Sequence, residues 1–174
     1  MNENIEVMLS EEKVDSRIRE MGAQISRDLA GETVRMITVL KGGAMFACEL
    51  AKRLTIPLTM DFLTASSYGS GTVSSGKVEL KQEDDLEVEG QTVLIAEDII
   101  DSGNTLSRLV AVMKEKGAKR VVICTLLNKP SRREVELDVD YTGFEIPDAF
   151  VVGYGLDYDQ KYRNLPFVGV LKEV

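Results

Sequence analysis

The sequence has 174 residues, a length that suits one domain with a hydrophobic core and is short for two. Its formal net charge of −8 disfavours a general nucleic-acid or anionic-membrane surface, because such a surface needs a basic stripe. Apolar residues make up 44% of the chain, and no apolar run approaches the roughly 20 residues of a membrane helix. We therefore expect a soluble, cytoplasmic protein, one domain over residues 1–174, with neither nucleic acid nor membrane as its partner.

The sequence contains no histidine, and this excludes Ser-His-Asp and Cys-His catalytic sites together with most zinc sites. Any proton transfer near neutral pH must then come from a carboxylate, a lysine, a tyrosine or a cysteine. The two cysteines, Cys48 and Cys124, lie far apart inside apolar segments and form no CxxC motif. We expect them to be buried free thiols rather than a disulfide.

The first third of the chain shows a clear change from helical to strand periodicity. After Ser10, a candidate N-cap, apolar residues recur at spacings of three and four up to Gly31, a candidate helix stop. The elements predicted here are a helix over 10–30, a strand over 34–40, a helix from 44 to about 54, and a strand over 58–63.

Residues 66–76 differ in composition from the rest of the chain. Eight of these eleven residues are serine or glycine, which predicts a mobile loop. Residues 71–78 nearly spell a P-loop, but Val78 stands where a P-loop needs serine or threonine to reach Mg²⁺. Residues 77–81 also alternate like an exposed strand, so we interpret the glycine-rich stretch as a flap.

The second half of the chain again alternates strands with a helix. The elements predicted here are a helix over 105–116 and strands over 92–96, 120–127, 139–141, 149–156 and 167–171. The repeated order of strand, helix and strand predicts an α/β fold with a mainly parallel central sheet flanked by helices.

The segment from Val93 to Leu106 carries the strongest functional signal. A buried strand leads into two adjacent carboxylates, Glu97 and Asp98, and then into Asp101, a turn of small residues and a helix. In an open parallel sheet, ligands bind beyond the carboxyl ends of the strands, and such a turn at a helix N-terminus suits a phosphate monoester. Because carboxylates suit sugar hydroxyls or a divalent metal, the combination suggests a ribose 5-phosphate. The alternative is a solvated acidic turn without function.

Four separated motifs of this chain occur in the order found in one known family. Glu97–Leu106 resembles the phosphoribosyl-pyrophosphate signature of the type I phosphoribosyltransferases, and Leu40–Gly43 resembles their pyrophosphate loop. Leu127–Lys129 resembles the purine-selecting strand end of the hypoxanthine-guanine branch, and Ile146–Tyr158, followed by Arg163, resembles its purine-stacking hood. The resemblance covers nearly the whole chain. It implies the fold of that family, with a small hood mainly from the C-terminal part and a mobile flap over the site.

The resemblance implies purine salvage. A 6-oxopurine, hypoxanthine or guanine, would join C1 of phosphoribosyl pyrophosphate and give IMP or GMP with release of pyrophosphate. The transition state would resemble a ribosyl oxocarbenium ion, and Mg²⁺ would neutralise the leaving pyrophosphate. An acidic site also holds a polyanion poorly without a metal, so Mg²⁺ is expected on electrostatic grounds as well. The family further implies a homodimer or homotetramer.

Roles for the sugar-phosphate site follow from the motifs by resemblance. Asp101 would be the general base that takes the proton from purine N7. Glu97 and Asp98 would hold the ribose hydroxyls and a Mg²⁺, and Asp157 would approach the purine and a second Mg²⁺. The phosphate-binding residues would be Ser102, Gly103, Asn104 and Thr105 for the 5-phosphate, and Lys41, Gly42 and Arg163 for the pyrophosphate, with Lys161 as an alternative cation. Family members often have a non-proline cis peptide that enters the pyrophosphate loop.

Roles for the purine site follow in the same way. Lys129 would donate to the purine O6, which favours a 6-oxo group over the 6-amino group of adenine; the alternative is a solvated lysine. Phe150 would stack on the base, where the alternative is core packing, and Val151 would offer backbone contacts. The flap, led by Ser67 and Tyr68, would close to exclude water from the reacting sugar.

Two other functions compete with this interpretation. An enzyme that prefers xanthine belongs to the same class, because the 6-oxopurines differ at C2 and the sequence does not show how C2 is recognised. A regulator that senses phosphoribosyl pyrophosphate and binds nucleic acid belongs to a different class. The charge of −8 and the retained Lys129, Phe150 and Asp157 count against the regulator. One departure from the family is Ala149, where other members carry a charged side chain.

Overall fold

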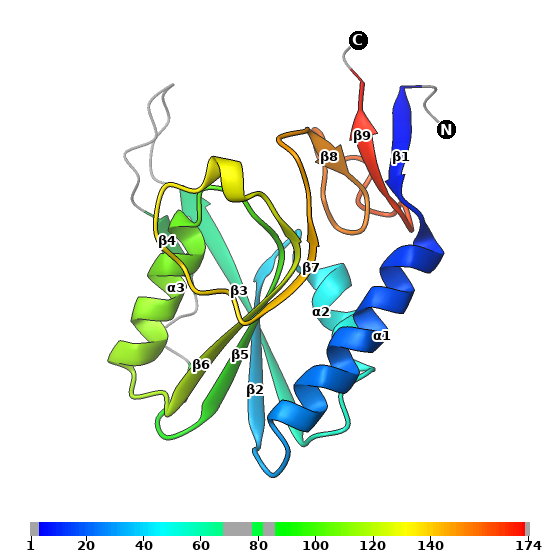
Figure 1. Cartoon of the computed structure of the whole chain (residues 1–174). Coiled ribbons are helices and arrows are strands. Elements are labelled where there is room, and N and C mark those ends of the chain that lie inside the picture. Colours follow the sequence, from blue (N-terminus) through cyan, green and yellow to red (C-terminus); the bar gives the residue numbers. More distant parts are fainter. Residues whose placement is uncertain (1–3, 68–77, 82–85, 173–174) are drawn as a thin grey trace.

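The computed structural model describes residues 4–67, 78–81 and 86–172 and is built around a six-stranded sheet (Figure 1). The strands of the chain are β1 (Ile5–Leu9), β2 (Val34–Leu40), β3 (Leu58–Ser67), β4 (Val78–Lys81), β5 (Thr92–Ile100), β6 (Arg120–Asn128), β7 (Tyr141–Glu145), β8 (Val151–Val152) and β9 (Val168–Leu171). The helices are α1 (Glu11–Asp28), α2 (Ala44–Ala51), α3 (Asn104–Glu115) and the short 3₁₀ turn η1 (Pro130–Arg132).

The order of strands in the large sheet is β4-β3-β2-β5-β6-β7. The pairs β3–β2, β2–β5, β5–β6 and β6–β7 are parallel, and only β4 runs antiparallel to its neighbour β3. The predicted α/β fold with a mainly parallel central sheet is therefore confirmed.

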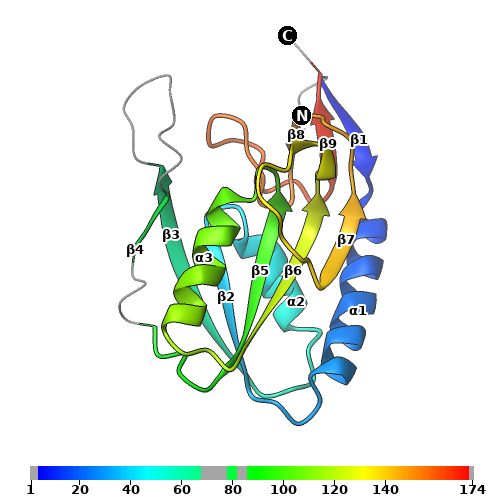
Figure 2. The same cartoon turned by 60° about the vertical axis from the view of Figure 1, so that its left-hand side comes forward.

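Helices cover both faces of this sheet. Helices α1 and α2 lie against one face, and α3 lies against the other (Figures 1 and 2). Along β5, Leu94 and Ala96 pack toward α1 and α2, whereas Val93 and Ile95 pack into the cluster around α3, and all four are fully buried. A strand buried on both faces appears in the sequence as an unbroken apolar run, which is why this strand was recognisable.

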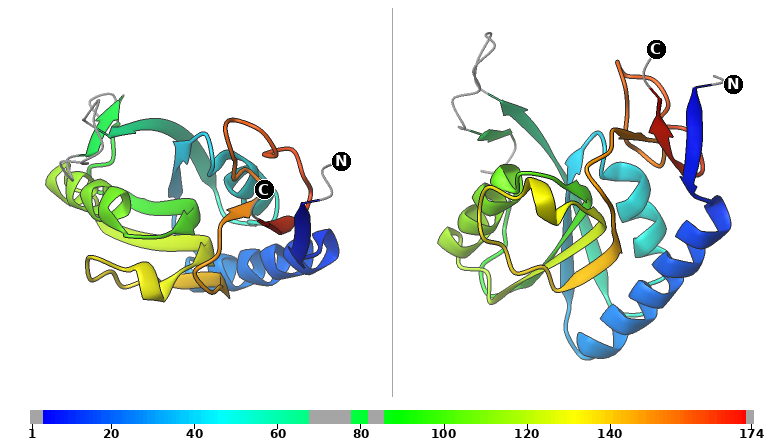
Figure 3. Two further views of the ribbon diagram at one scale, coloured as in Figure 1. Left: turned by 90° about the horizontal axis from the view of Figure 1, so that it is seen from above. Right: turned by 45° about the horizontal axis from the view of Figure 1, so that its top comes forward.

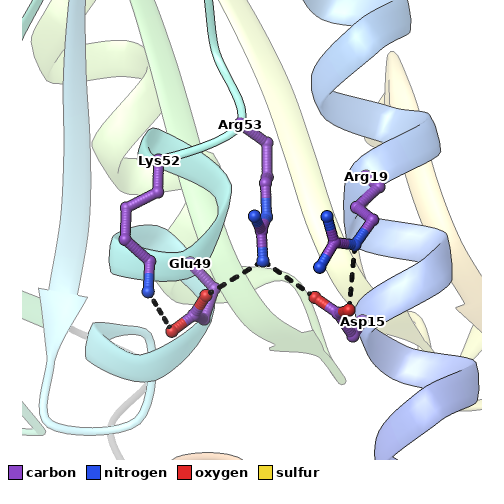
Figure 4. A network of polar contacts seen from close by, with 5 residues as sticks. All are labelled: Asp15, Arg19, Glu49, Lys52 and Arg53. Carbon is purple, nitrogen blue, oxygen red and sulfur yellow. Dashed lines mark hydrogen bonds and ion pairs between the residues drawn. The ribbon is translucent and has the colours of Figure 1, made fainter.

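A network of ion pairs joins α1 to the end of α2 (Figure 4). Asp15 accepts from Arg19 at 2.9 Å and from Arg53 at 3.0 Å, and Glu49 pairs with Lys52 at 2.7 Å and with Arg53 at 3.8 Å. These side chains are partly exposed, so each pair adds little stability. The two helices pack mainly through buried apolar side chains, among them Ile18 of α1 and Phe46 of α2, and α2 begins directly after the loop that follows β2.

A second, antiparallel sheet of three strands, in the order β1-β9-β8, forms the hood. We use the word hood for these three strands together with the loop over residues 153–166. The hood lies beyond the carboxyl ends of the parallel strands (Figure 2), and seen from above it covers α2 and the end of β2 (Figure 3). The carboxyl edge of the large sheet therefore faces the hood.

Several predicted boundaries were wrong. Strand β5 continues through residues 97–100, because these residues still pair with β6 at positions 125–128, and charge alone does not end a strand that has a partner. Strand β3 continues to Ser67, and the strand expected over 149–156 has only two residues. Strand β1 was not predicted.

The prediction of two buried free thiols was correct for Cys124 and wrong about the burial of Cys48. Both are free, and Cys124 is buried in the core, but Cys48 is exposed. Cys48 lies on the outer side of α2, because the buried face of this helix is formed by Phe46, Ala47 and Leu50. None of the helices among the described residues is long and apolar enough to cross a membrane.

Candidate active site

The predicted site residues gather at the carboxyl edge of the large sheet, below the hood. They come from the ends of β2, β5 and β6 and from the hood loop, which are the positions where ligands bind in open α/β sheets. We divide the site into two ends. The pyrophosphate end comprises Lys41, Gly42, Asp157, Gln160 and Arg163. The base end comprises Asp101, Lys129, Arg132, Asp148 and Phe150.

The two adjacent carboxylates of β5 face opposite sides of the strand. Because β5 continues to Ile100, successive side chains alternate, so Glu97 and Asp98 do not form a side-by-side pair. Glu97 lines a pocket with the residues of the following turn, whereas Asp98 approaches Gly42. The sequence analysis ended the strand at residue 96, before both carboxylates, and was wrong on this point.

Burial raises the pKa of both carboxyl groups. It raises the pKa of Glu97 well above its ordinary value, and the charge of Asp98 raises it further. Burial also raises the pKa of Asp98 to about 6, against the opposing hydrogen bond from the backbone N–H of Ile99 at 2.9 Å. Among the described residues, Glu97 Oε1 has no hydrogen-bond partner. Buried acids of this kind, in a cleft, are typical of functional sites.

The turn after β5 forms a pocket of about 130 Å³ at the start of α3. Its wall includes Asp101, Ser102, Gly103 and Thr105, so it contains most of the predicted phosphate cradle. Gly103 is in the left-handed region with φ of 87° and precedes α3. The backbone N–H of Asn104 donates to Ser102 Oγ at 3.3 Å, which leaves the following N–H groups at the helix N-terminus available to a ligand. The side chain of Asn104 points elsewhere and donates to Glu134 at 2.7 Å.

The loop between β2 and α2 is held very close to β5. It is entered by a cis peptide bond between Leu40 and Lys41, as the family resemblance implies. A Cβ on Gly42 would lie 1.9 Å from Asp98 Oδ2, so only glycine fits there. A Cβ on Gly43 would lie 2.2 Å from Oγ1 of the buried Thr38. The loop can therefore present its backbone to a ligand beside Asp98.

The hood loop meets this loop at the pyrophosphate end. A Cβ on Gly155, which has φ of 100°, would lie 2.1 Å from the carbonyl oxygen of Gly42. Arg163 donates to the Gly155 carbonyl at 2.7 Å and pairs with Asp157 at 2.7 Å. Lys161 pairs with Asp159 instead and is 69% exposed, so Arg163 is the cation that faces Gly42.

At the base end, an unbroken chain of charges runs from Lys129, directly after β6, to Asp101 in the turn after β5. The Lys129 ammonium lies 3.9 Å from Asp148, which lies 3.5 Å from Arg132, which in turn lies 3.2 Å from Asp101. The Lys129 side chain is only 8% exposed, which contradicts the alternative of a solvated lysine. The sequence analysis assigned no role to Asp148 or to Arg132.

Two aromatic rings stand beside these charges. Phe150 is 55% exposed, so it is not a core residue. Its ring meets that of Tyr158 edge to face, with centroids 5.7 Å apart. Val151 is buried and pairs with Val170 in the hood sheet. An exposed flat ring on a rigid strand end is a surface on which a planar ligand can stack.

The predicted metal ligands Glu97, Asp98 and Asp157 do not form one cluster, because Glu97 faces the other side of β5. Among the described residues, no group of three or more acidic, cysteine or histidine side chains is placed to hold a metal ion. The donor chemistry nevertheless fits Mg²⁺. Asp98 is buried near the charge of Asp157, and Mg²⁺ usually takes one or two carboxylates and completes its shell with substrate phosphates and water.

The predicted flap lies mostly outside the described residues. Ser67 is the last residue of β3, and Tyr68 is not described, so the structure does not test this prediction.

Comparison with known proteins gives one consistent result. Residues 8–159 match the model of the phosphoribosyl transferase domain family. The chain is 49% identical over 173 residues to the hypoxanthine-guanine phosphoribosyltransferase of Bacillus subtilis, covering 99% of this chain and 96% of that protein. It is 47% identical over 172 residues to the hypoxanthine phosphoribosyltransferase of Salmonella typhimurium, covering 97% and 96%. It also matches the bifunctional TilS/HprT protein of Listeria monocytogenes at 48% identity, but spans only 26% of that protein's length.

Solved structures agree with these sequence relatives. A crystal structure of a hypoxanthine phosphoribosyltransferase from Staphylococcus aureus matches with a TM-score of 0.92 and 42% identity, covering 97% of this chain and 92% of that one. The hypoxanthine phosphoribosyltransferase of Trypanosoma cruzi, solved in complex with the product IMP, matches with a TM-score of 0.91 and 36% identity, covering 99% and 97%.

Proposed function

The chain belongs to the phosphoribosyltransferase family, and from this premise we propose that it is a purine-salvage enzyme. It transfers the 5-phosphoribosyl group of phosphoribosyl pyrophosphate to hypoxanthine or guanine, and the products are IMP or GMP and pyrophosphate. The whole of residues 1–174 acts as one domain, in the cytoplasm, as a homodimer or homotetramer.

Binding of the sugar phosphate uses the carboxyl edge of the sheet. The 5-phosphate lies in the pocket after β5, where Ser102, Gly103 and Thr105 and the open N-terminus of α3 supply donors. The pyrophosphate lies against the backbone of Gly42 and the cations of Lys41 and Arg163. The sugar spans the two phosphate sites.

Transfer requires one bond to break and one to form at the sugar C1. The bond from C1 to the pyrophosphate oxygen breaks, and purine N9 forms the new bond to C1. Asp101, at the edge of the phosphate pocket, takes the proton that leaves purine N7. Closure of the flap from Ser67 and Tyr68 excludes water from the oxocarbenium-like sugar, because water would otherwise compete with the base.

When bound, Mg²⁺ acts as a Lewis acid that neutralises the charge developing on pyrophosphate. Asp98 and Asp157 would hold it, directly or through water, whereas Glu97, on the other side of β5, lines the phosphate pocket and would reach a metal only through the bound sugar or a water. The raised pKa of Asp98 supports this role, because a buried carboxyl group without a bound cation is costly to ionise.

Choice of the base depends on the base end of the site. Lys129 donates to the purine O6, an interaction that the 6-amino group of adenine cannot accept. Phe150 stacks on the purine ring, and the backbone of Val151 contacts its edge. The observation that supports the proposal most directly is the buried Lys129 ammonium, because it is linked through Asp148 and Arg132 to Asp101.

An ultraviolet assay with phosphoribosyl pyrophosphate, Mg²⁺ and each of hypoxanthine, guanine, xanthine and adenine tests this function. We expect turnover of hypoxanthine or guanine, none of adenine, and loss of turnover in excess chelator. Asp101→Asn should lower kcat by about 100-fold or more, whereas the exposed Asp159→Asn should not. Preference for xanthine would indicate the related activity. Tight binding of phosphoribosyl pyrophosphate without turnover of any base would contradict the enzyme and favour a sensor.

A further inference from the structure

Gln160 joins the two cations of the pyrophosphate end. The Lys41 ammonium donates to Gln160 Oε1 at 3.0 Å, and Arg163 Nη2 donates to the same oxygen at 3.5 Å. Lys41 belongs to the loop after β2, whereas Gln160 and Arg163 belong to the hood loop. One neutral amide oxygen therefore connects cations from two segments that are 119 residues apart in sequence.

The backbone around Gln160 adopts strained conformations, and these place the side-chain oxygen of Gln160 beside Lys41. Asp159, Gln160 and Tyr162 have φ of 49°, 63° and 75°, a region that residues other than glycine rarely adopt. The turn is held by Asp157, whose Oδ2 accepts from the backbone N–H of Gln160 at 2.8 Å. Strain of this kind collects at functional sites, because only a functional gain offsets its cost.

The chemical type of the shared acceptor decides how much charge the site retains. Arg163 already pairs with the carboxylate of Asp157 at 2.7 Å. Within the described residues, the Lys41 ammonium has Gln160 as its only hydrogen-bond or ion-pair partner. An amide oxygen fixes the Lys41 ammonium in place without cancelling its charge, whereas a carboxylate at the same position would compete with an incoming anion.

We propose that Gln160 is a positioning residue for pyrophosphate, a conclusion that rests on the proposed function. In the free protein it aligns Lys41 and Arg163, and on binding its Oε1 is exchanged for an oxygen of the pyrophosphate group. The ligand thus meets cations whose positions are already fixed, and little side-chain freedom is lost on binding. The position requires an amide, because a carboxylate would pair with both cations and compete with pyrophosphate for them.

The test compares Gln160→Glu and Gln160→Ala with a matched control, Gln91→Glu. Gln91 bonds the backbone of Glu87 and carries the same change of charge before the start of β5, at the opposite edge of the sheet. We measure the dissociation constant of Mg²⁺-pyrophosphate by calorimetry and the KM values of both substrates. Thermal unfolding shows whether each variant is folded.

For Gln160→Glu we expect pyrophosphate binding about 10-fold weaker and a KM for phosphoribosyl pyrophosphate raised about 10-fold, since a charge-assisted pair must be broken. Gln160→Ala should weaken both by about 3-fold, from lost alignment alone. The purine KM should stay within about 2-fold in both variants, because the base end is untouched.

Two results would overturn the role of Gln160. One is an unchanged affinity for pyrophosphate in both variants, and the other is a Gln160→Glu effect equal to that of Gln91→Glu. The calorimetric titration needs no turnover, so it separates this inference from the proposed function. If wild type bound pyrophosphate but turned over no base, the proposed function would fail while the role of Gln160 would still be decided by the titration.

Discussion

The two ends of the site hold their cations with different chemistry. At the pyrophosphate end, the oxygen shared by two cations is the neutral amide of Gln160. At the base end, the oxygens shared by two cations belong to the carboxylate of Asp148. The arrangement is similar, since each acceptor side chain lies between two cations, but the pyrophosphate end keeps a net positive charge and the base end does not.

This difference matches the ligands that the two ends are proposed to take. A pyrophosphate group carries several negative charges, so uncancelled cations add directly to its binding. A purine is neutral and offers one carbonyl oxygen, so a lysine that is fixed in position suffices and excess charge adds little. The charge of a binding site therefore depends on the acceptor that lies between two cations as well as on the cations. A neutral acceptor suits an anionic ligand, and a carboxylate suits a neutral one.

The largest effect is expected when a methyl group is added at Gly42, where it would collide with Asp98 at the pyrophosphate end. In Gly42→Ala the new methyl group would lie 1.9 Å from Asp98 Oδ2, so the loop or the carboxylate must move. We expect kcat/KM for phosphoribosyl pyrophosphate to fall by about 100-fold, because displacements near 1 Å have that effect. Gly90→Ala is the control: nothing lies within 4 Å of its added Cβ, and its φ of 68° makes it a stability change only. Unchanged kinetics in Gly42→Ala would show that the backbone there does not set the site.

The second-largest effect concerns Asp98 and the pH dependence of the free energy of unfolding. Its pKa of about 6 exceeds the ordinary value of 3.8, so the folded state binds a proton more tightly than the unfolded state. Stability should therefore fall as pH rises from about 4 to 6 and should stay lower above that pH. In chelator, the free energy of unfolding of Asp98→Asn should exceed that of wild type by about 3 kcal/mol at pH 7 and should be nearly equal to it at pH 4, because one pKa unit corresponds to about 1.4 kcal/mol. Urea titrations across this range measure it, and parallel curves for the two proteins would contradict it.

A smaller effect follows from converting the acceptor at the base end into an amide. Asp148→Asn mirrors Gln160→Glu, because it removes a carboxylate from between two cations. Lys129 should be held less firmly, and we expect the purine KM to rise about 5-fold while the KM for phosphoribosyl pyrophosphate changes by less than 2-fold. Steady-state kinetics with each substrate varied in turn provide the measurement. A change confined to the phosphoribosyl pyrophosphate KM would remove the distinction between the two ends.

The smallest effect is expected for Arg132→Gln. Arg132 and Asp101 are both about half exposed, and exposed ion pairs contribute at most about 1 kcal/mol. We expect kcat for hypoxanthine to change by less than about 5-fold, with a weaker effect at high salt. A loss as large as that of Asp101→Asn would make Arg132 a part of the catalytic group rather than a neighbour of it.

Local pattern predicted most of the large sheet and its helices. Helix α1 and strand β2 were predicted close to their observed ends, because the helical periodicity begins after the N-cap Ser10 and stops before Gly31, and an apolar strand pattern follows. The end of β5 was missed, since it is fixed by pairing with β6 rather than by composition. Strand β1 was missed for the same reason, because its partner β9 lies at the other end of the chain.

The site residues, like the strands, could be predicted where a local motif identifies them and not where distant contacts fix them. Motif resemblance identified the turn after β5, the loop at Gly42 and the lysine at 129, and the structure brings all three to one edge of the sheet. Gln160 and Asp148 were not identified, because their contacts depend on how the hood sits over the sheet. No property of a glutamine in sequence shows that a left-handed turn will carry its oxygen to Lys41.

The pairing of β9 with both β1 and β8 has a consequence for the order in which the substrate sites form. The hood sheet cannot be completed until residues 168–171 have been synthesised, whereas β2, β3, β5 and the phosphate turn all come earlier in the chain. On a chain emerging from the ribosome, the parallel strands β2, β3, β5 and β6 can therefore pair before the hood sheet closes over their carboxyl ends.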